Sequence, residues 1–143
     1  MAQPGPYLSW SRRTVPLMTT ETTPAIRYAA VTFDCADPAG LARFYGELLG
    51  YRTLFATDDF VLLGTEGTPG LGFTRVADYR PPTWPDAAQG KQAHIELGVD
   101  DLAAAERRVL ELGATKPEFQ PGEKRWTVLL DPAGHPFCIT TLA

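Results

Sequence analysis

The stretch AVTFDCAD at residues 30–37 has a counterpart in HIELGVDD at residues 94–101, and these two stretches decide the fold. Apolar side chains occupy every second position of both: Val31, Phe33 and Cys35, then Ile95, Leu97 and Val99. Alternation with a period of two predicts strands that bury one face and leave the other face polar or open. Each stretch ends in acidic residues that can begin a helix. We therefore expect a duplicated unit in which a strand runs into a helix.

A helical pattern follows each strand. Asp37 can cap a first helix that starts at Pro38 and ends before Gly50, whereas Asp100 or Asp101 can cap a second helix that ends at Gly113. The apolar stripes of the two helices are Leu41, Phe44, Tyr45 and Leu48, then Leu102, Ala105, Val109 and Leu112. Equivalent residues of the two copies stay in register along the strand and the helix, so the chain contains an internal duplication.

Three β-like runs follow each helix: 51–57, 60–64 and 71–76, then 115–119, 125–130 and 137–141. Half of this chain is too short to close a core of its own, so the two halves should pack together. We predict an α+β fold in which paired βαβββ modules, 26–77 and 91–142, form a cup-shaped mixed sheet with the helices outside. Residues 78–90 are the Pro-rich connector between the modules, and residues 1–25 lack periodicity and should be a flexible N-terminal extension.

Composition excludes several classes of protein. With 44% hydrophobic and 21% charged residues over 143 positions, the chain has the composition of a soluble globular domain. It contains no run of about 18 apolar residues for a membrane span. The net charge of -4 and the scattered basic pairs do not favour nucleic-acid binding. We expect a cytoplasmic protein in which Cys35 and Cys138 are reduced thiols, with Cys35 packed against a helix.

Three motifs stand in order on this duplicated scaffold. They are Asp37-Pro38-Ala39 leading to FYGELLG at 44–50, HIEL at 94–97 leading to DDL at 100–102, and DPAGHPF at 131–137. Together they resemble the glyoxalase/bleomycin resistance protein/extradiol dioxygenase superfamily, whose fold is called vicinal oxygen chelate, and most closely its glyoxalase-like domain branch. The resemblance covers residues 26–142 and implies paired βαβββ modules whose strands form a cup.

The same resemblance bears on metal binding, because many members of the superfamily hold a divalent metal with side chains from the first and last strands of each module. Carried over by motif, these positions are Ala30, Thr74, His94 and Cys138. A catalytic metal of this kind needs about three protein ligands, yet Ala30 has no ligand atom and Thr74 is a poor ligand. We therefore expect no bound metal and no cofactor, and a divalent metal is the alternative.

Eight side chains are candidates for contacts with a small molecule in the cup. Each of them lies on a polar strand face, stands at a position implied by the resemblance or carries an indole ring. They are Thr32, Asp34, Thr74, Trp84, His94, Glu96, Trp126 and Cys138. His94 is either a strand histidine bonded to a neighbour, or a ligand contact or general base oriented by Glu96 or Asp34. Cys138 is either a small buried side chain or a nucleophile activated by His94. Trp84 and Trp126 either line the pocket or pack elsewhere, and His135, in a turn, should face solvent.

Two functions from different classes follow. The first is a metal-free, small-molecule-binding protein that sequesters a planar or drug-like metabolite, as the bleomycin-resistance relatives do. The second is an enzyme of the same superfamily, a lyase or isomerase of the glyoxalase type or a dioxygenase, which uses a divalent metal or His94 as a base. Because paired modules in this superfamily often dimerise and open sheet edges need covering, we also expect a homodimer.

Overall fold

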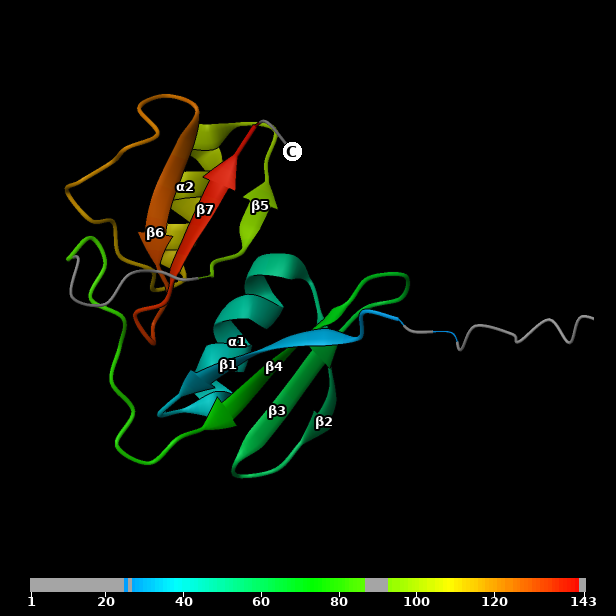
Figure 1. Ribbon diagram of the computed structural model, residues 1–143. Helices are drawn as coiled ribbons and strands as arrows, with labels where there is room; N and C mark the ends of the chain where they lie inside the picture. The colour runs from blue at the N-terminus through cyan, green and yellow to red at the C-terminus, as the bar shows by residue number, and fades with distance from the viewer. Residues whose placement is uncertain (1–24, 26, 87–92, 142–143) are drawn as a thin grey trace, which may run out of the picture.

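The computed structural model describes residues 25, 27–86 and 93–141 (Figure 1). Residues 1–24 of the predicted extension and residues 87–90 of the predicted connector lie outside this description. Within the described ranges, no helix has both the length and the apolar character that crossing a membrane requires.

The first module has the predicted order of one strand, one helix and three strands. Its elements are β1 (Ala30–Cys35), α1 (Pro38–Leu49), β2 (Arg52–Ala56), β3 (Phe60–Gly64) and β4 (Gly70–Arg75). The sheet order is β1-β4-β3-β2, in which β1 and β4 are parallel and the other pairs are antiparallel. Asp37 caps α1 as predicted, because its carboxylate accepts a 3.1 Å hydrogen bond from Gly40 N, and Gly50 ends the helix with a φ of 71°.

The second module is shorter. It consists of β5 (Glu96–Gly98), α2 (Leu102–Glu111), β6 (Trp126–Leu130) and β7 (Pro136–Thr140), with the sheet order β5-β7-β6. The predicted strand at 115–119 is wrong: only Thr115 forms a bridge, with Leu130. Pro117 interrupts the run and has no N–H to donate to a strand ladder.

A side chain replaces part of the missing strand. The Gln120 amide lies beside the outer edge of β6, where its Oε1 accepts a hydrogen bond from Val128 N and its Nε2 donates to Val128 O, both at 2.9 Å. These are the two bonds that a paired strand residue would make with Val128. Gln120 thus satisfies the backbone groups of Val128 on this edge without a fourth strand.

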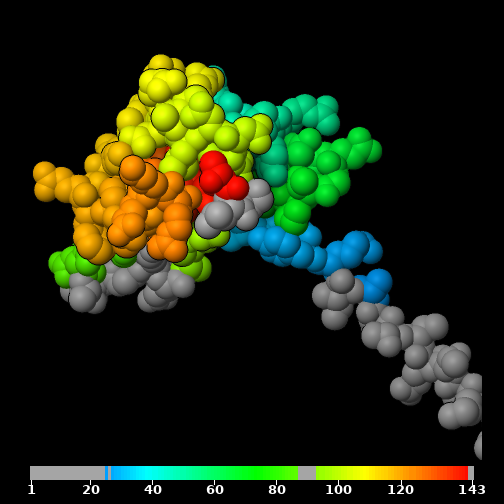
Figure 2. Space-filling model, turned by 90° about the horizontal axis from the view of Figure 1, so that it is seen from above, coloured from blue at the N-terminus to red at the C-terminus, as the bar shows by residue number. Residues whose placement is uncertain are grey.

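Aromatic side chains join the two modules in one core. Phe33 and Phe73 stack on Tyr45 of α1 with ring centroids 5.9 and 5.5 Å away, and Phe137 of β7 contacts the same tyrosine ring at 6.2 Å. Helix α1 therefore lies between its own sheet and the second module (Figure 1). Seen from above, the second module in yellow and orange sits beside the first in blue to green (Figure 2). The structure confirms the α+β class and the paired modules. The strands divide between two mixed sheets rather than forming one cup-shaped sheet, and α1 lies between its own sheet and the second module instead of outside (Figure 1).

Candidate functional site

The alternation read from the sequence sets the two faces of β1. Thr32 and Asp34 are exposed, whereas Cys35 is buried, so the polar residues lie on the face away from α1. Asp34 is the register partner of Thr74 on β4. Three predicted ligand contacts therefore share the open face of the first sheet.

A second group of polar residues gathers on the second sheet. One ligand atom each from His94, Glu96 and Cys138 lies within 4.8 Å of the other two, and His94 Nε2 is 3.5 Å from Glu96 Oε1. Glu96 is the register partner of Cys138, which explains how two strands far apart in sequence bring these groups together. Cys138 is only 2% exposed, whereas the side chains of His94 and Glu96 are 27% and 62% exposed. The cluster thus presents an imidazole and a carboxylate to solvent above a buried thiol.

The metal positions implied by the resemblance do not fit a metal held between the modules. Ala30 lies opposite Gly70, so neither residue of that pair has a ligand side chain. The described residues that bring three donor atoms together, His94, Glu96 and Cys138, all belong to the second module. The family arrangement, with ligands from both modules, is therefore incomplete on the side of the first module.

The two tryptophans predicted to line a pocket pack against other side chains. Trp84 lies against Phe119, with ring centroids 5.9 Å apart. The Arg125 guanidinium stands over the Trp126 ring, 4.8 Å from its centroid. Both indoles are half-buried and keep part of their surface accessible.

A buried hydrogen-bond network joins the modules and was missed from the sequence. The Tyr45 hydroxyl donates to Asp131 Oδ2 at 2.7 Å, and Asp131 Oδ1 accepts from the backbone N–H groups of Ala133 and His135. Burial raises the pKa of Asp131. Several interactions partly oppose this rise, and the largest of them is the hydrogen bond from Tyr45. The carboxylate therefore shapes the turn that precedes β7 and ties this turn to α1.

The expectation that His135 faces solvent is wrong. Its Nε2 lies 2.6 Å from the carbonyl oxygen of Asp34 and 3.2 Å from the Tyr79 hydroxyl. The Tyr79 hydroxyl itself donates to Ala133 O at 2.6 Å, and burial raises the Tyr79 pKa to about 12. Since a carbonyl only accepts, His135 Nε2 carries the proton in this contact. The imidazole thereby links the end of β1 to the second module.

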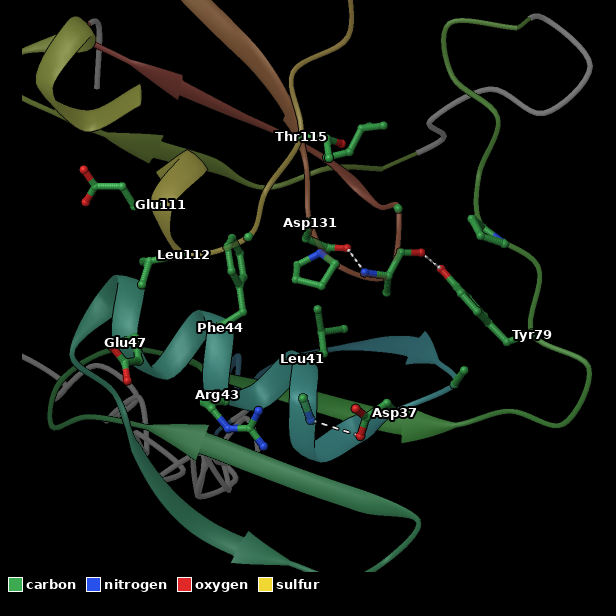
Figure 3. Close-up of a pocket in the computed structure, with 18 residues that line it drawn as sticks. Asp37, Leu41, Arg43, Phe44, Glu47, Tyr79, Glu111, Leu112, Thr115 and Asp131 are labelled. Carbon is green, nitrogen blue, oxygen red and sulfur yellow. Dashed lines mark hydrogen bonds between the residues drawn. The ribbon is translucent and has the colours of Figure 1, made fainter. Parts of the chain in front are cut away.

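A cavity lies beside this network rather than on the predicted face. It has a volume of about 980 Å³ and separates α1 from the end of α2 and the turn at 131–134 (Figure 3). Leu41, Phe44 and Leu112 supply apolar surface, while Arg43 and Glu111 bring charges. The sequence analysis did not predict this groove, because its walls come from helix faces and a turn that meet through tertiary packing.

Comparison with known proteins agrees with this architecture. The family model described as "Glyoxalase-like domain" matches residues 30–140. A search of curated proteins finds no significant match.

Solved structures share the fold. A possible glyoxalase from Bacillus cereus is 12% identical with a TM-score of 0.60. The alignment covers 81% of this chain and 99% of the Bacillus cereus chain. A glyoxalase/bleomycin resistance protein/dioxygenase family enzyme from Burkholderia phytofirmans is 18% identical with a TM-score of 0.60, over 80% of this chain and 97% of its own. The fosfomycin resistance protein from Mesorhizobium loti is also 18% identical with a TM-score of 0.60. The alignment covers 83% of this chain and 92% of the fosfomycin resistance protein.

The match to the family model spans both modules, and the neighbours share the vicinal oxygen chelate fold. On these grounds the chain belongs to the glyoxalase-like domain family.

Proposed function

We propose that this chain is a small-molecule-binding member of the glyoxalase-like family that works without the family's metal and sequesters a planar or drug-like metabolite. The observation that carries the proposal is the convergence of His94, Glu96 and Cys138 on one sheet, to which the described residues of the first module add no donor. A group of polar side chains of this kind suits recognition of a ligand, since specific sites combine apolar walls with a few placed polar groups.

In this proposal the polar contacts come from the second sheet. The half-buried imidazole of His94, oriented by Glu96 at 3.5 Å, can accept or donate a hydrogen bond near neutral pH. The accessible surfaces of Trp84 and Trp126 are suited to a planar ring. The buried thiol of Cys138 packs beneath the imidazole and contributes shape rather than chemistry.

An enzymatic role is the second candidate, and the contact between His94 and Glu96 is what favours it. The Glu96 carboxylate, 3.5 Å from His94 Nε2, can orient the imidazole, which is an arrangement that a general base can use when it removes a proton from a substrate. Such an enzyme is a lyase or isomerase of the glyoxalase type. A dioxygenase needs a metal site as well, and Ala30 and Thr74 of the first module supply no good ligand for it.

The test combines an unbiased thermal-shift screen with substitutions at two places. For the strongest compound from the screen, we expect His94→Ala to weaken binding by about 1–3 kcal/mol, the range for a lost partner of a buried polar group. Arg43→Ala, at the rim of the groove beside α1, serves as the matched control and should leave the affinity unchanged. Isothermal titration measures both, and unfolding curves check that each variant keeps its fold.

The opposite pattern would place the ligand in the groove. If Arg43→Ala weakens binding while His94→Ala has no effect, the polar face is not the binding site. If His94→Ala instead lowers the unfolding temperature strongly and leaves the affinity intact, His94 is a structural histidine. Turnover of the compound, lost on substitution of His94, supports the enzymatic candidate.

A further inference from the structure

The groove beside α1 lies apart from the polar face of the second sheet. It is enclosed by α1, the end of α2 and the turn at 131–134, and neither His94 nor Glu96 lines it. Its volume of about 980 Å³ falls in the range of about 300–1,000 Å³ that is typical of small-molecule sites. Leu41 and Phe44 supply apolar surface from α1. The groove therefore has the size and the apolar surface of a second ligand site.

Hydrogen bonds hold the walls of this groove in place. Asp131 Oδ1 accepts a bond from Ala133 N at 2.9 Å, and the Tyr79 hydroxyl donates to Ala133 O at 2.6 Å. On α1, the Asp37 carboxylate accepts a bond from Gly40 N at 3.1 Å (Figure 3). All five of these residues line the groove. Because the walls are already ordered, a ligand that binds between them loses less free energy to ordering.

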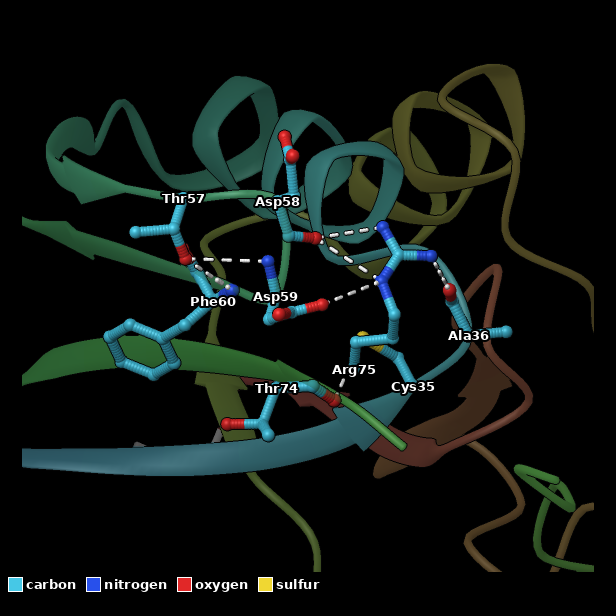
Figure 4. Close-up of polar contacts among 8 residues, drawn as sticks. All are labelled: Cys35, Ala36, Thr57, Asp58, Asp59, Phe60, Thr74 and Arg75. Atoms are coloured by element: carbon cyan, nitrogen blue, oxygen red, sulfur yellow. Dashed lines mark hydrogen bonds and ion pairs between the residues drawn. The ribbon is translucent and has the colours of Figure 1, made fainter. Parts of the chain in front are cut away.

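The arginines near this groove direct much of their charge elsewhere. Arg75 Nη1 donates at 3.1 Å to the carbonyl oxygen of Ala36, which lines the groove. The same guanidinium is paired with the carboxylate of Asp59, whose Oδ1 lies 3.3 Å from Arg75 Nε (Figure 4). Arg43 lines the groove but extends below α1 (Figure 3), and it also lines a smaller hollow between α1 and strands β2 and β3. Little positive charge therefore reaches the inside of the groove.

Glu111 brings an unpaired negative charge to the groove. It is the last residue of α2, and the backbone dipole at this end of a helix favours a cation. The three carbonyl groups before it accept hydrogen bonds from residues 112–114, whereas no described residue donates to the carbonyl or carboxylate oxygens of Glu111. Glu47 lies on the same side of the groove (Figure 3) and has a partner, Arg108, at 3.8 Å. Glu111 is therefore the group in this groove that is best placed to contact a cation.

We propose that this groove is a second binding site, which takes a protonated amine with an apolar body, such as an arylalkylamine. The apolar body lies against Leu41 and Phe44, and the ammonium group donates hydrogen bonds to the oxygens of Glu111 at the end of α2. An anion of the same shape is disfavoured, because it meets the carboxylates of Asp37, Glu47 and Glu111. This site is independent of the ligand proposed for the face that holds His94.

The first test compares three probes that differ only at the polar end. Isothermal titration of the full chain with phenylbutylamine, phenylbutanol and phenylbutyrate keeps the apolar body constant and changes its end from cation to neutral group to anion. We expect the amine to bind about three- to fivefold more tightly than the alcohol, and the acid to bind more weakly than the alcohol. The advantage of the amine should shrink at high salt, which screens exposed charges.

The second test removes the charge at the end of α2. Glu111→Gln should weaken amine binding by about three- to fivefold and leave alcohol binding unchanged. Glu66→Gln makes the same charge change on an exposed residue that does not line the groove, and it should have no effect. His94→Ala should also leave amine binding unchanged, which separates this site from the polar face. In amide NMR spectra of the full chain, the amine should shift the signals of Gly113 and Thr115, which line the groove.

Three results would overturn the proposal. The first is an alcohol or an acid that binds as tightly as the amine, or an amine that does not bind up to its solubility limit. The second is an equal effect of Glu111→Gln and Glu66→Gln on amine binding. The third is a set of NMR shifts confined to β5 and β7, which would place the amine on the polar face. A failed ligand screen at His94 leaves all three comparisons intact.

Discussion

Tyr45→Phe removes one hydroxyl group that joins the two modules. That hydroxyl donates to Asp131 Oδ2 at 2.7 Å, and both side chains are buried. A hydrogen bond to a charged group contributes about 1.5–3 kcal/mol, and its loss leaves a buried carboxylate oxygen short of a donor. We expect the free energy of unfolding at neutral pH to fall by about 2–3 kcal/mol, measured by urea denaturation with an unchanged m-value.

Tyr51→Phe is the matched control. The Tyr51 hydroxyl bonds Thr68 Oγ1 at 3.1 Å in an exposed position, where water can replace the lost partner. This variant should change the free energy of unfolding by no more than about 0.5 kcal/mol. Equal costs for the two substitutions would refute the argument that burial of Asp131 makes the Tyr45 bond important.

The pH dependence gives a second check on the same bond. Burial raises the pKa of Asp131 above its ordinary value of 3.8, so the folded chain binds this proton more readily than the unfolded chain does. The contribution of Asp131 to stability is therefore greatest below that value and declines as pH rises through the raised pKa. Below the raised pKa the bond joins two neutral groups, and the cost of Tyr45→Phe should shrink to about 1 kcal/mol. A cost that stays constant between acidic and neutral pH would contradict this account.

Two further predictions concern the second module. Gln120→Ala should lower the free energy of unfolding by about 1–2 kcal/mol in urea denaturation, because Val128 N and Val128 O each lose a partner. Gln120→Glu retains only the acceptor for Val128 N, so its free energy of unfolding should lie between those of the original chain and Gln120→Ala. Purified protein dialysed against metal-free buffer should carry less than about a tenth of an equivalent of Zn, Mn, Fe or Ni by elemental analysis, since the positions that the resemblance implies in the first module, Ala30 and Thr74, supply no good ligand. Retention of about one equivalent that His94→Ala abolishes would show that His94, Glu96 and Cys138 suffice to hold a metal.

Local patterns in the sequence were enough to predict the modules. The period-two alternation around Phe33 and Leu97 sets the faces of β1 and β5, and Asp37 and Gly50 mark the ends of α1. These features depend on the backbone and on near neighbours in sequence. The same alternation also predicted that His94 and Glu96 share a face, and their 3.5 Å contact agrees with it.

Features that depend on packing between the modules could not be predicted. Tyr45 lay on the apolar stripe of a helix, and nothing in that stripe indicated a hydroxyl bonded to Asp131, 86 residues later. His135 turns toward β1 because Asp131 organises the turn before it, which is a tertiary effect. The strand expected at 115–119 had the right composition except for Pro117, whose missing N–H outweighed it.

The central claim is that a ligand binds on the face that holds His94 without help from a metal. The most direct test titrates the strongest screened compound into the full chain in excess chelator, and again after zinc, manganese, iron or nickel is added. We predict the same dissociation constant within about twofold in every condition, and a value about 5- to 150-fold weaker for His94→Ala in chelator. Binding that disappears in chelator and returns with one of the metals would contradict the claim and favour a metal-dependent enzyme.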